Sequence, residues 1–148
     1  MAGQKDIHNT MLQTTLFIDP IISTNTISLS KIIDTVKFSG NEFLIIATAI
    51  TDGTYVISVQ EGDEVDDEAT PTVITDGATV ETEDLLVTLS NLTFTVAETA
   101  STSRVGYIGS KRWLRLEIES TDVSTGGIFS TVSIQGNPKR AETEDNFS

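Results

Sequence analysis

Residues 42–60 read Glu-Phe-Leu-Ile-Ile-Ala-Thr-Ala-Ile-Thr-Asp-Gly-Thr-Tyr-Val-Ile-Ser-Val-Gln, and this stretch decides the predicted fold class. Residues 54–60 alternate firmly apolar side chains with other types, which is the period of a half-buried β-strand. Residues 42–50 form a denser apolar run, and the pair Asp52-Gly53 between the two segments is a strong turn signal. The pattern therefore predicts two strands joined as a hairpin.

Segments of similar pattern recur along the chain at spacings of roughly 8–12 residues. Further strands are predicted at residues 14–18, 26–33, 72–74, 84–89, 92–96, 104–108, 112–119 and 128–134. Turn signals at Ser90-Asn91 and at Gly126-Gly127 predict a second and a third hairpin.

The alternation also predicts which side chains of the third hairpin face the core. In its first strand the inward positions are Leu114, Leu116 and Ile118. Trp113 and Arg115 are then expected to point outward. In its second strand the apolar positions are Ile128, Val132 and Ile134.

Composition supports the same fold class. About a quarter of the 148 residues are Thr or Ser, and Ile and Val are abundant, so the chain is rich in β-branched side chains that suit a pleated surface. No window of 11 or more residues has helical apolar spacing and a cap. We predict an all-β, single-domain antiparallel β-sandwich with eight to nine strands. The sandwich spans residues 14–136, and the aperiodic ends are an extended N-terminal arm (1–13) and a C-terminal tail (137–148).

Charge restricts the partners. The formal net charge is −13, and all of it lies in residues 1–103, which hold three Lys and no Arg. Such a surface repels phosphate backbones, so no nucleic-acid partner is predicted. The longest uninterrupted apolar run is four residues, at 43–46, against about 20 for a membrane span, so no membrane partner is predicted. The chain has no Cys, and its opening residues do not resemble a secretory signal, so assembly in a reducing cytosol is expected.

An acidic segment at residues 61–68 carries six carboxylates in eight positions. It fails the calcium-loop template, because a loop starting at Asp63 has Val65 at position 3 and Ile74 at position 12. Like charges at this density resist folding inward, so a projecting, solvated loop is expected. An irregular divalent-cation site, or a site for a basic partner, is the alternative.

Residues that carry chemistry are scarce. His8 is the only imidazole, it lies in the predicted arm, and the absence of Cys excludes thiol nucleophiles and Cys-based metal sites. Paired carboxylates could in principle hydrolyse glycosides, but nine aromatic residues leave few to form a sugar platform. We predict no catalytic residue, no metal ligand and no cofactor, and therefore no enzyme.

One local basic feature stands out, formed by Tyr107, Lys111, Arg112, Trp113 and Arg115. An outward Trp beside Arg is the composition of a protein-interface anchor. Exposed cross-strand pairing of the Arg with nearby acids explains the same residues structurally. These five are the interface candidates of the sequence.

Residues 104–119 read Arg-Val-Gly-Tyr-Ile-Gly-Ser-Lys-Arg-Trp-Leu-Arg-Leu-Glu-Ile-Glu, and residues 125–140 read Thr-Gly-Gly-Ile-Phe-Ser-Thr-Val-Ser-Ile-Gln-Gly-Asn-Pro-Lys-Arg. These segments, with residues 51–64, resemble a family of small structural proteins of tailed-bacteriophage virions. The resemblance covers roughly residues 40–140. It implies a capsid decoration (cement) protein on the exterior of the virion shell, non-enzymatic and jelly-roll-like. It also implies binding to the major capsid protein and self-association as a dimer or trimer.

Alternatives to this reading remain open. A head-tail connector or a tail-associated virion protein would share the resemblance but would assemble as a ring. A virion-displayed carbohydrate-binding module would retain polysaccharide. A hydrolase with paired carboxylates would show an activity that is lost when Asp or Glu is replaced.

Overall fold

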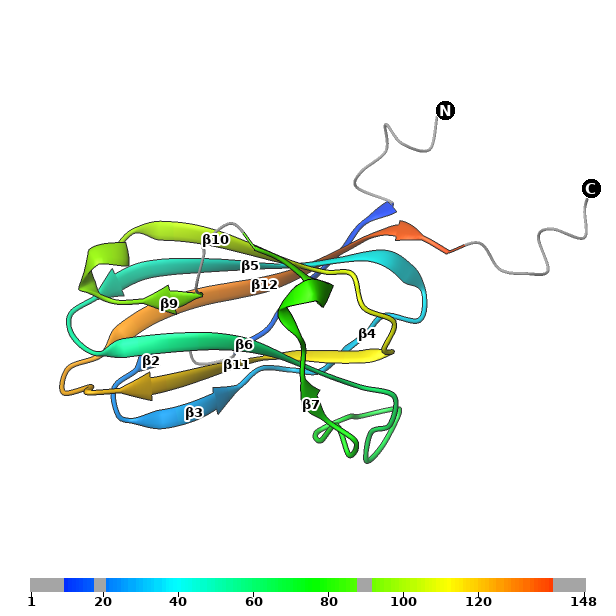
Figure 1. The fold of residues 1–148 in the computed structure, drawn as a ribbon, viewed down its shortest axis with the longest axis horizontal. Coiled ribbons are helices and arrows are strands. Elements are labelled where there is room, and N and C mark those ends of the chain that lie inside the picture. The colour runs from blue at the N-terminus through cyan, green and yellow to red at the C-terminus, as the bar shows by residue number, and fades with distance from the viewer. Residues whose placement is uncertain (1–9, 18–20, 88–91, 140–148) are drawn as a thin grey trace, which may run out of the picture.

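A computed structural model describes residues 10–17, 21–87 and 92–139 and shows two antiparallel sheets packed face to face (Figure 1). The described residues form the strands β1 (Leu12–Thr15), β2 (Ile21–Ile22), β3 (Thr26–Leu29), β4 (Ile33–Asp34), β5 (Phe38–Ile50), β6 (Thr54–Gly62), β7 (Ala78–Thr79), β8 (Leu85–Val87), β9 (Thr93–Phe94), β10 (Ser101–Tyr107), β11 (Trp113–Thr121) and β12 (Gly127–Pro138). Short 3₁₀ turns at Thr82–Asp84 and Val96–Glu98 complete them. The predicted all-β sandwich is confirmed.

The strand order is that of a jelly roll. One sheet, here called sheet A, runs β1-β12-β5-β10-β8, with β2 also paired to β12. The other, sheet B, runs β3-β11-β6-β7, with β4 on β11 and β9 on β6. If the eight strands β1, β3, β5, β6, β7, β10, β11 and β12 are numbered one to eight, the two sheets read 1-8-3-6 and 2-7-4-5. These are the two interleaved four-stranded sheets of a jelly roll.

All three hairpins predicted from the sequence are wrong. In each case the two consecutive strands lie in different sheets: β5 in sheet A and β6 in sheet B, β8 in A and β9 in B, β11 in B and β12 in A. The turn expected at Ser90-Asn91 lies outside the described residues. The β5–β6 and β11–β12 connections are therefore arches between the two layers.

The carboxylate of Asp52 joins the β5–β6 connection to the β11–β12 connection. Asp52 lies in the turn between β5 and β6, and its side chain accepts hydrogen bonds from the backbone N–H groups of Ser124, Thr125 and Gly126 at 3.2, 2.8 and 2.9 Å. These three bonds lower the pKa of Asp52, the one from Gly126 most strongly. The Asp-Gly pair that signals a hairpin thus joins two cross-sheet turns side by side.

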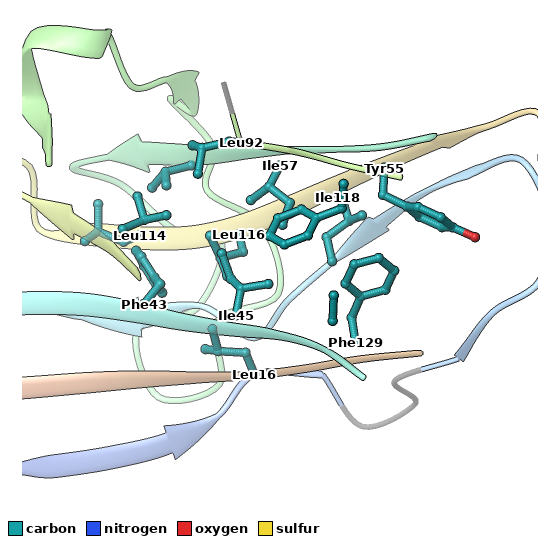
Figure 2. Close-up of a cluster of buried hydrophobic side chains, with 14 of the residues drawn as sticks. Leu16, Phe43, Ile45, Tyr55, Ile57, Leu92, Leu114, Leu116, Ile118 and Phe129 are labelled. Atoms are coloured by element: carbon teal, nitrogen blue, oxygen red, sulfur yellow. The ribbon is translucent and has the colours of Figure 1, made fainter. Parts of the chain in front are cut away.

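The core lies between the sheets (Figure 2). Sheet A contributes Phe43, Ile45 and Phe129, and sheet B contributes Tyr55 and Leu116, all almost fully buried. The Phe129 ring lies 4.7 Å from the Tyr55 ring between centroids. It therefore joins the two sheets by an aromatic contact across the sandwich.

The side chains of β12 that point into the core are not the ones that its apolar alternation predicts. The buried side chains are Phe129, Thr131, Ser133 and Gln135. The side chains between them face out of the sandwich; they are Ile128, Ser130, Val132 and Ile134. In the register with β5, Ser133 lies opposite Phe43 and Thr131 opposite Ile45. Small side chains opposite large ones let the two sheets approach, so packing overrides the apolar alternation.

Two of the buried polar side chains on β12 lack a hydrogen bond to the described residues: the hydroxyls of Thr131 and Ser133. We expect Thr131→Val to raise the free energy of unfolding by about 1 kcal/mol, because valine has nearly the same shape and removes a buried unpaired hydroxyl. Chemical denaturation measures this change. Thr102→Val makes the same replacement at an exposed position and should have little effect. A loss of stability in Thr131→Val would contradict the prediction.

The two ends of the described chain leave the sandwich side by side. Leu12, at the start of β1, pairs with Gln135 near the end of β12. Strand pairing therefore extends from residue 12 to residue 138, two residues into the predicted arm and two into the predicted tail. Residues 1–9 and 140–148, with His8, lie outside the described residues. The described residues include no helix of the length and apolarity needed to cross a membrane.

Candidate functional site

The five sequence-predicted interface residues gather at one corner of the sandwich. Tyr107 ends β10, Lys111 and Arg112 lie in the following loop, and Trp113 and Arg115 begin β11. We call this set the basic corner. It faces residues 63–77, the acidic loop, which connects β6 to β7.

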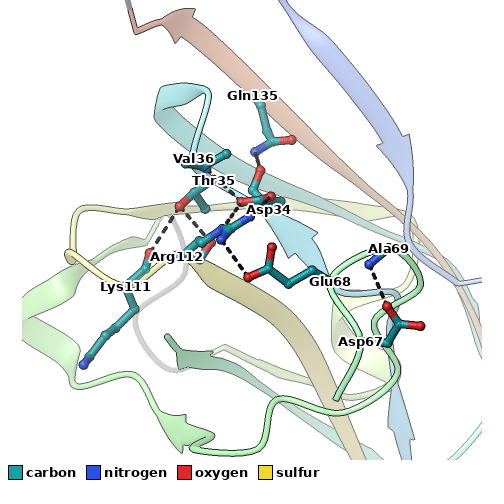
Figure 3. A network of polar contacts seen from close by, with 9 residues as sticks. All are labelled: Asp34, Thr35, Val36, Asp67, Glu68, Ala69, Lys111, Arg112 and Gln135. Carbon is teal, nitrogen blue, oxygen red and sulfur yellow. Dashed lines mark hydrogen bonds and ion pairs between the residues drawn. The ribbon is translucent and has the colours of Figure 1, made fainter. Parts of the chain in front are cut away.

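Arg112 is the centre of this corner (Figure 3). Its Nε and Nη2 atoms donate to the two carboxylate oxygens of Asp34 at 3.0 and 2.9 Å, and its Nη1 donates to Glu68 at 3.2 Å. Its guanidinium also lies 4.5 Å from the centre of the Trp113 ring. Partial burial raises the pKa of Asp34, but the hydrogen bonds from Arg112 and Val36 outweigh it, so this pKa lies below its ordinary value. The side-chain donors of Arg112 are therefore bonded to acids of the same chain. Its two parallel bonds to Asp34 have the geometry that suits a carboxylate.

Lys111 makes a weaker contact. Its Nζ lies 2.6 Å from Asp63, and both side chains are about half exposed. The hydrogen bond and charge of Asp63 raise the pKa of the lysine. An exposed pair of this kind contributes little to stability, so Lys111 remains accessible to a partner.

Tyr107 connects the two sheets at this corner. Its ring is buried, its hydroxyl donates to Glu61 on β6, and the same oxygen accepts from the Lys111 backbone N–H at 2.9 Å. Burial and the bond to Glu61 raise its pKa well above the usual value. A second cross-sheet bond runs from Gln135 Nε2 on β12 to the Asp34 carbonyl on β4, at 2.9 Å.

Trp113 points outward, as the alternation predicts, but it is not the exposed residue that an interface anchor would be. It lies on the outer face of sheet B, and only 2% of it is exposed. Its partner in register is Gly62, and Ile74 and Asp76 occupy the space where a side chain on Gly62 would lie. Directly paired residues share a face of the sheet, so the acidic loop folds over the face that carries Trp113.

Arg115 is linked to the acid Glu117 through the side-chain amide of Gln60. Its Nε donates to the Gln60 side-chain oxygen at 2.7 Å, and the Gln60 amide nitrogen donates to Glu117 at 2.7 Å. Its Nη1 also reaches the Thr72 carbonyl of the acidic loop at 3.4 Å. The expected pairing with strand acids thus passes through Gln60, a residue that strand alternation did not single out.

The acidic loop is solvated, as predicted, since its residues 66–70 are exposed. It is also folded on itself, because its carboxylates accept hydrogen bonds from its own backbone. Asp66 accepts from the backbone N–H groups of Thr72 and Val73 at 2.8 and 2.9 Å. Asp76 accepts from those of Asp63 and Glu64. Within the part of the chain that the structure describes, no three acidic or His side chains are grouped as they would be to hold a metal ion. Instead, backbone amides solvate the carboxylates and close the loop.

The ionised form of Asp66 should stabilise this loop. Hydrogen bonds from the Thr72 side chain and from the backbone of Val73 and Thr72 lower its pKa well below the ordinary 3.8. Since folding lowers the pKa, the stabilisation is present above pH 3.8 and is lost as the pH falls through the lowered value. NMR titration should place Asp66 below 3.8, with the Thr72 and Val73 amide signals moving together. Titration of Asp66 at or above 3.8 would contradict this.

The sequence did not reveal the outer face of sheet A as a candidate site. Its outward apolar side chains, which we call the apolar face, are Leu44 and Ile46 on β5, Leu86 on β8, and Ile128, Val132 and Ile134 on β12. Polar side chains share this face, among them Thr48 on β5, Thr102 on β10 and Ser130 on β12. Antiparallel sheets usually turn polar side chains to solvent, so the apolar ones make the face a candidate interaction surface. One signal of outward apolar side chains was present in the sequence, namely the apolar run at residues 43–46. A strand that is apolar at every position is apolar on both faces.

The fold and these surfaces define the class of protein: a jelly-roll β-sandwich with an internally bonded polar corner and with exposed apolar side chains on its outer faces. No protein-family model matches the chain, and the comparison with curated proteins gives no match. The class therefore rests on the chain's own geometry.

Proposed function

We propose that this chain is a non-enzymatic structural protein of a bacteriophage virion that decorates the capsid shell and stabilises it by binding the major capsid protein. The observation that carries the proposal is the apolar face of sheet A. Side chains such as Val132 and Ile134 point away from the core while Thr131 and Ser133 occupy it. A protein covering this face removes the apolar side chains from water.

Stiffness also supports the proposal, because a protein that holds neighbouring subunits together must resist deformation. Two side-chain bonds, Tyr107 to Glu61 and Gln135 to the Asp34 carbonyl, tie sheet A to sheet B. Jelly rolls occur in viral capsid proteins as well as in lectins, so the fold agrees with the proposal by analogy.

The terminal segments would supply further contacts. Residues 1–9 and 140–148 are attached at neighbouring points of sheet A, since β1 pairs with β12. Two segments leaving one end of a rigid body can reach the same neighbouring subunit. Many copies on one shell would sum such contacts.

Particle composition tests this function. We expect quantitative mass spectrometry of purified particles from the source phage to find the chain in tens to hundreds of copies, and a map of the particle to place it on the shell exterior. A single ring of copies at the neck or tail would contradict decoration, as would absence from the particle.

Deletion variants test the terminal segments. Chains lacking residues 1–9 or residues 140–148 keep every described strand. At least one deletion is expected to reduce co-sedimentation with empty capsid shells relative to the full chain. Equal occupancy by the full chain and both variants would show that neither segment binds the shell.

A further inference from the structure

We propose that an apolar pocket at one edge of the sandwich, here called the edge pocket, receives an apolar side chain of a partner protein, from a segment in which Lys or Arg residues flank that side chain. The inference deepens the proposed function by giving the chemistry of the partner segment. It rests on that function only in naming the capsid protein as the partner.

The edge pocket has a volume of about 230 Å³ and lies between the two sheets, where β7 is the edge of sheet B and β8 is the edge of sheet A. Two exposed lining side chains, Thr82 and Val87, form its mouth. The buried lining side chains form its floor, and they are Ile57, Val59, Val80 and Leu92. The pocket is therefore an opening in the side of the core with an apolar interior.

Strand pairing on β6 accounts for the opening. Along the outer edge of β6, β9 pairs with one half of the strand and β7 with the other. The last bond on one side runs from the Ile57 N–H to the Leu92 carbonyl, at 2.9 Å, and the first on the other side from the Val80 N–H to the Val59 carbonyl, at 2.8 Å. Between these bonds the chain leaves sheet B to form β8 in sheet A, and no described strand continues the ladder across Ser58 on this edge. The edge of sheet B is thus interrupted beside the core.

Charge selects the occupant. Three acids flank the lining residues Thr82 and Leu85 in the segment between β7 and β8, namely Glu81, Glu83 and Asp84. None of the three is ion-paired with a described residue. Neither the lining nor this segment contains a Lys or Arg. An apolar side chain flanked by basic residues therefore complements both the interior and the rim, whereas a second copy of this chain, with net charge −13, is repelled.

The volume suits one large side chain. An apolar cavity of about 150 Å³ can hold a benzene ring, and pockets for drug-sized ligands begin at about 300 Å³. At about 230 Å³, the edge pocket has room for a single Phe or Leu side chain. Side chains that fill a desolvated pocket in this way are the anchors that dominate the binding energy of protein interfaces.

The edge pocket adjoins the apolar face. Leu86 on β8 belongs to that face and is 60% exposed. The next residue, Val87, pairs with the buried Val105, so it points to the core side of the sheet. A partner that covers the apolar face can therefore reach round the edge strand β8 and insert a side chain into the edge pocket.

Three short peptides test the chemistry of the partner. Lys-Lys-Phe-Lys-Lys supplies the anchor and the charge, Lys-Lys-Ser-Lys-Lys lacks the anchor, and Glu-Glu-Phe-Glu-Glu reverses the charge. In NMR titrations of the full chain, we expect the first peptide to give saturable shifts of the Ile57, Val80 and Val87 amide signals. The other two should bind at least about tenfold more weakly. Equal binding of the Phe and Ser peptides, or no shift at these amides, would overturn the inference.

A matched pair of variants tests the place. Val87 and Val56 are both 42% exposed. Val87→Phe puts a ring into the mouth of the edge pocket, whereas Val56→Phe puts one on the outer side of sheet B. Both sites already reach solvent, so both variants should fold, which circular dichroism checks. Val87→Phe is expected to weaken binding of the Lys-Lys-Phe-Lys-Lys peptide at least about tenfold and Val56→Phe to leave it unchanged. Equal affinity of the two variants would rule out the edge pocket as the site.

A second pair tests the acidic rim. Glu83→Lys and Glu119→Lys change the net charge equally, and Glu119 is exposed on the outer side of sheet B. We expect Glu83→Lys to weaken binding of the same peptide several-fold more than Glu119→Lys does. Equal weakening would mean that net charge alone attracts the peptide, and the rim would have no part in selecting the partner.

These results are separable from the test of the proposed function. A chain that binds the peptides as expected but is absent from phage particles would keep this inference and end the proposed function. A chain that decorates the shell but does not distinguish the three peptides would do the reverse.

Discussion

Replacing Phe129 by alanine is expected to lower the free energy of unfolding by about 3–5 kcal/mol, one of the two largest effects that we predict. Phe129 is 1% exposed and contacts two other rings. Its centroid lies 4.7 Å from that of Tyr55 and 5.9 Å from that of Phe94, the latter edge-on. Truncation therefore opens a cavity between the sheets and removes both aromatic contacts.

The neighbouring residue serves as the control. Ile128 lies on the outer face and is 37% exposed, so Ile128→Ala should cost much less than Phe129→Ala in chemical denaturation. The apolar alternation of the sequence predicts the opposite ranking. A larger loss in Ile128→Ala would show that the phase of β12 is the one predicted from the sequence.

Trp113→Ala is the second prediction with a large effect. We expect it to lower the free energy of unfolding by about 3–5 kcal/mol, because a large buried ring is removed from under the acidic loop. The stacking of Arg112 on this ring is lost as well. The loop should then open, and a glutamate-specific protease should cleave faster after Glu64 and Glu68.

Trp113→Phe keeps an aromatic ring at the site and should retain most of the stability and the protection of the loop. An exposed interface anchor would behave differently. Its replacement by alanine would leave stability and proteolysis unchanged and alter only binding to a partner. That outcome would contradict the buried position of Trp113.

The class of fold could be predicted from the sequence because strand formation leaves a local signal. Tyr55, Ile57 and Val59 alternate, and all three are buried. The same holds for Leu114, Leu116 and Ile118, which were predicted inward and lie in the core. A period of two residues is a property of neighbouring positions, so composition and spacing record it.

The pairing of the strands could not be predicted in the same way. Asp52-Gly53 marks a turn, but a turn signal does not say whether the next strand returns beside the first or crosses to the other sheet. The basic corner illustrates the same difficulty. Five candidates were identified there, but their partners Asp34 and Glu61 were not, because 78 residues separate Arg112 from Asp34 and 46 separate Tyr107 from Glu61.

By itself, the sequence determined that this chain is acidic and is an all-β sandwich, but not which strands pair within each sheet. Only the tertiary structure decided that Trp113 is buried, that the acidic loop folds over it, and that Val132 and Ile134 face outward. The physical reason is that period and charge belong to each segment of the chain, whereas burial depends on what packs against it. Phe43 and Ile45 took the interior opposite Ser133 and Thr131, and Ile128, Val132 and Ile134 of β12 were left on the outer face.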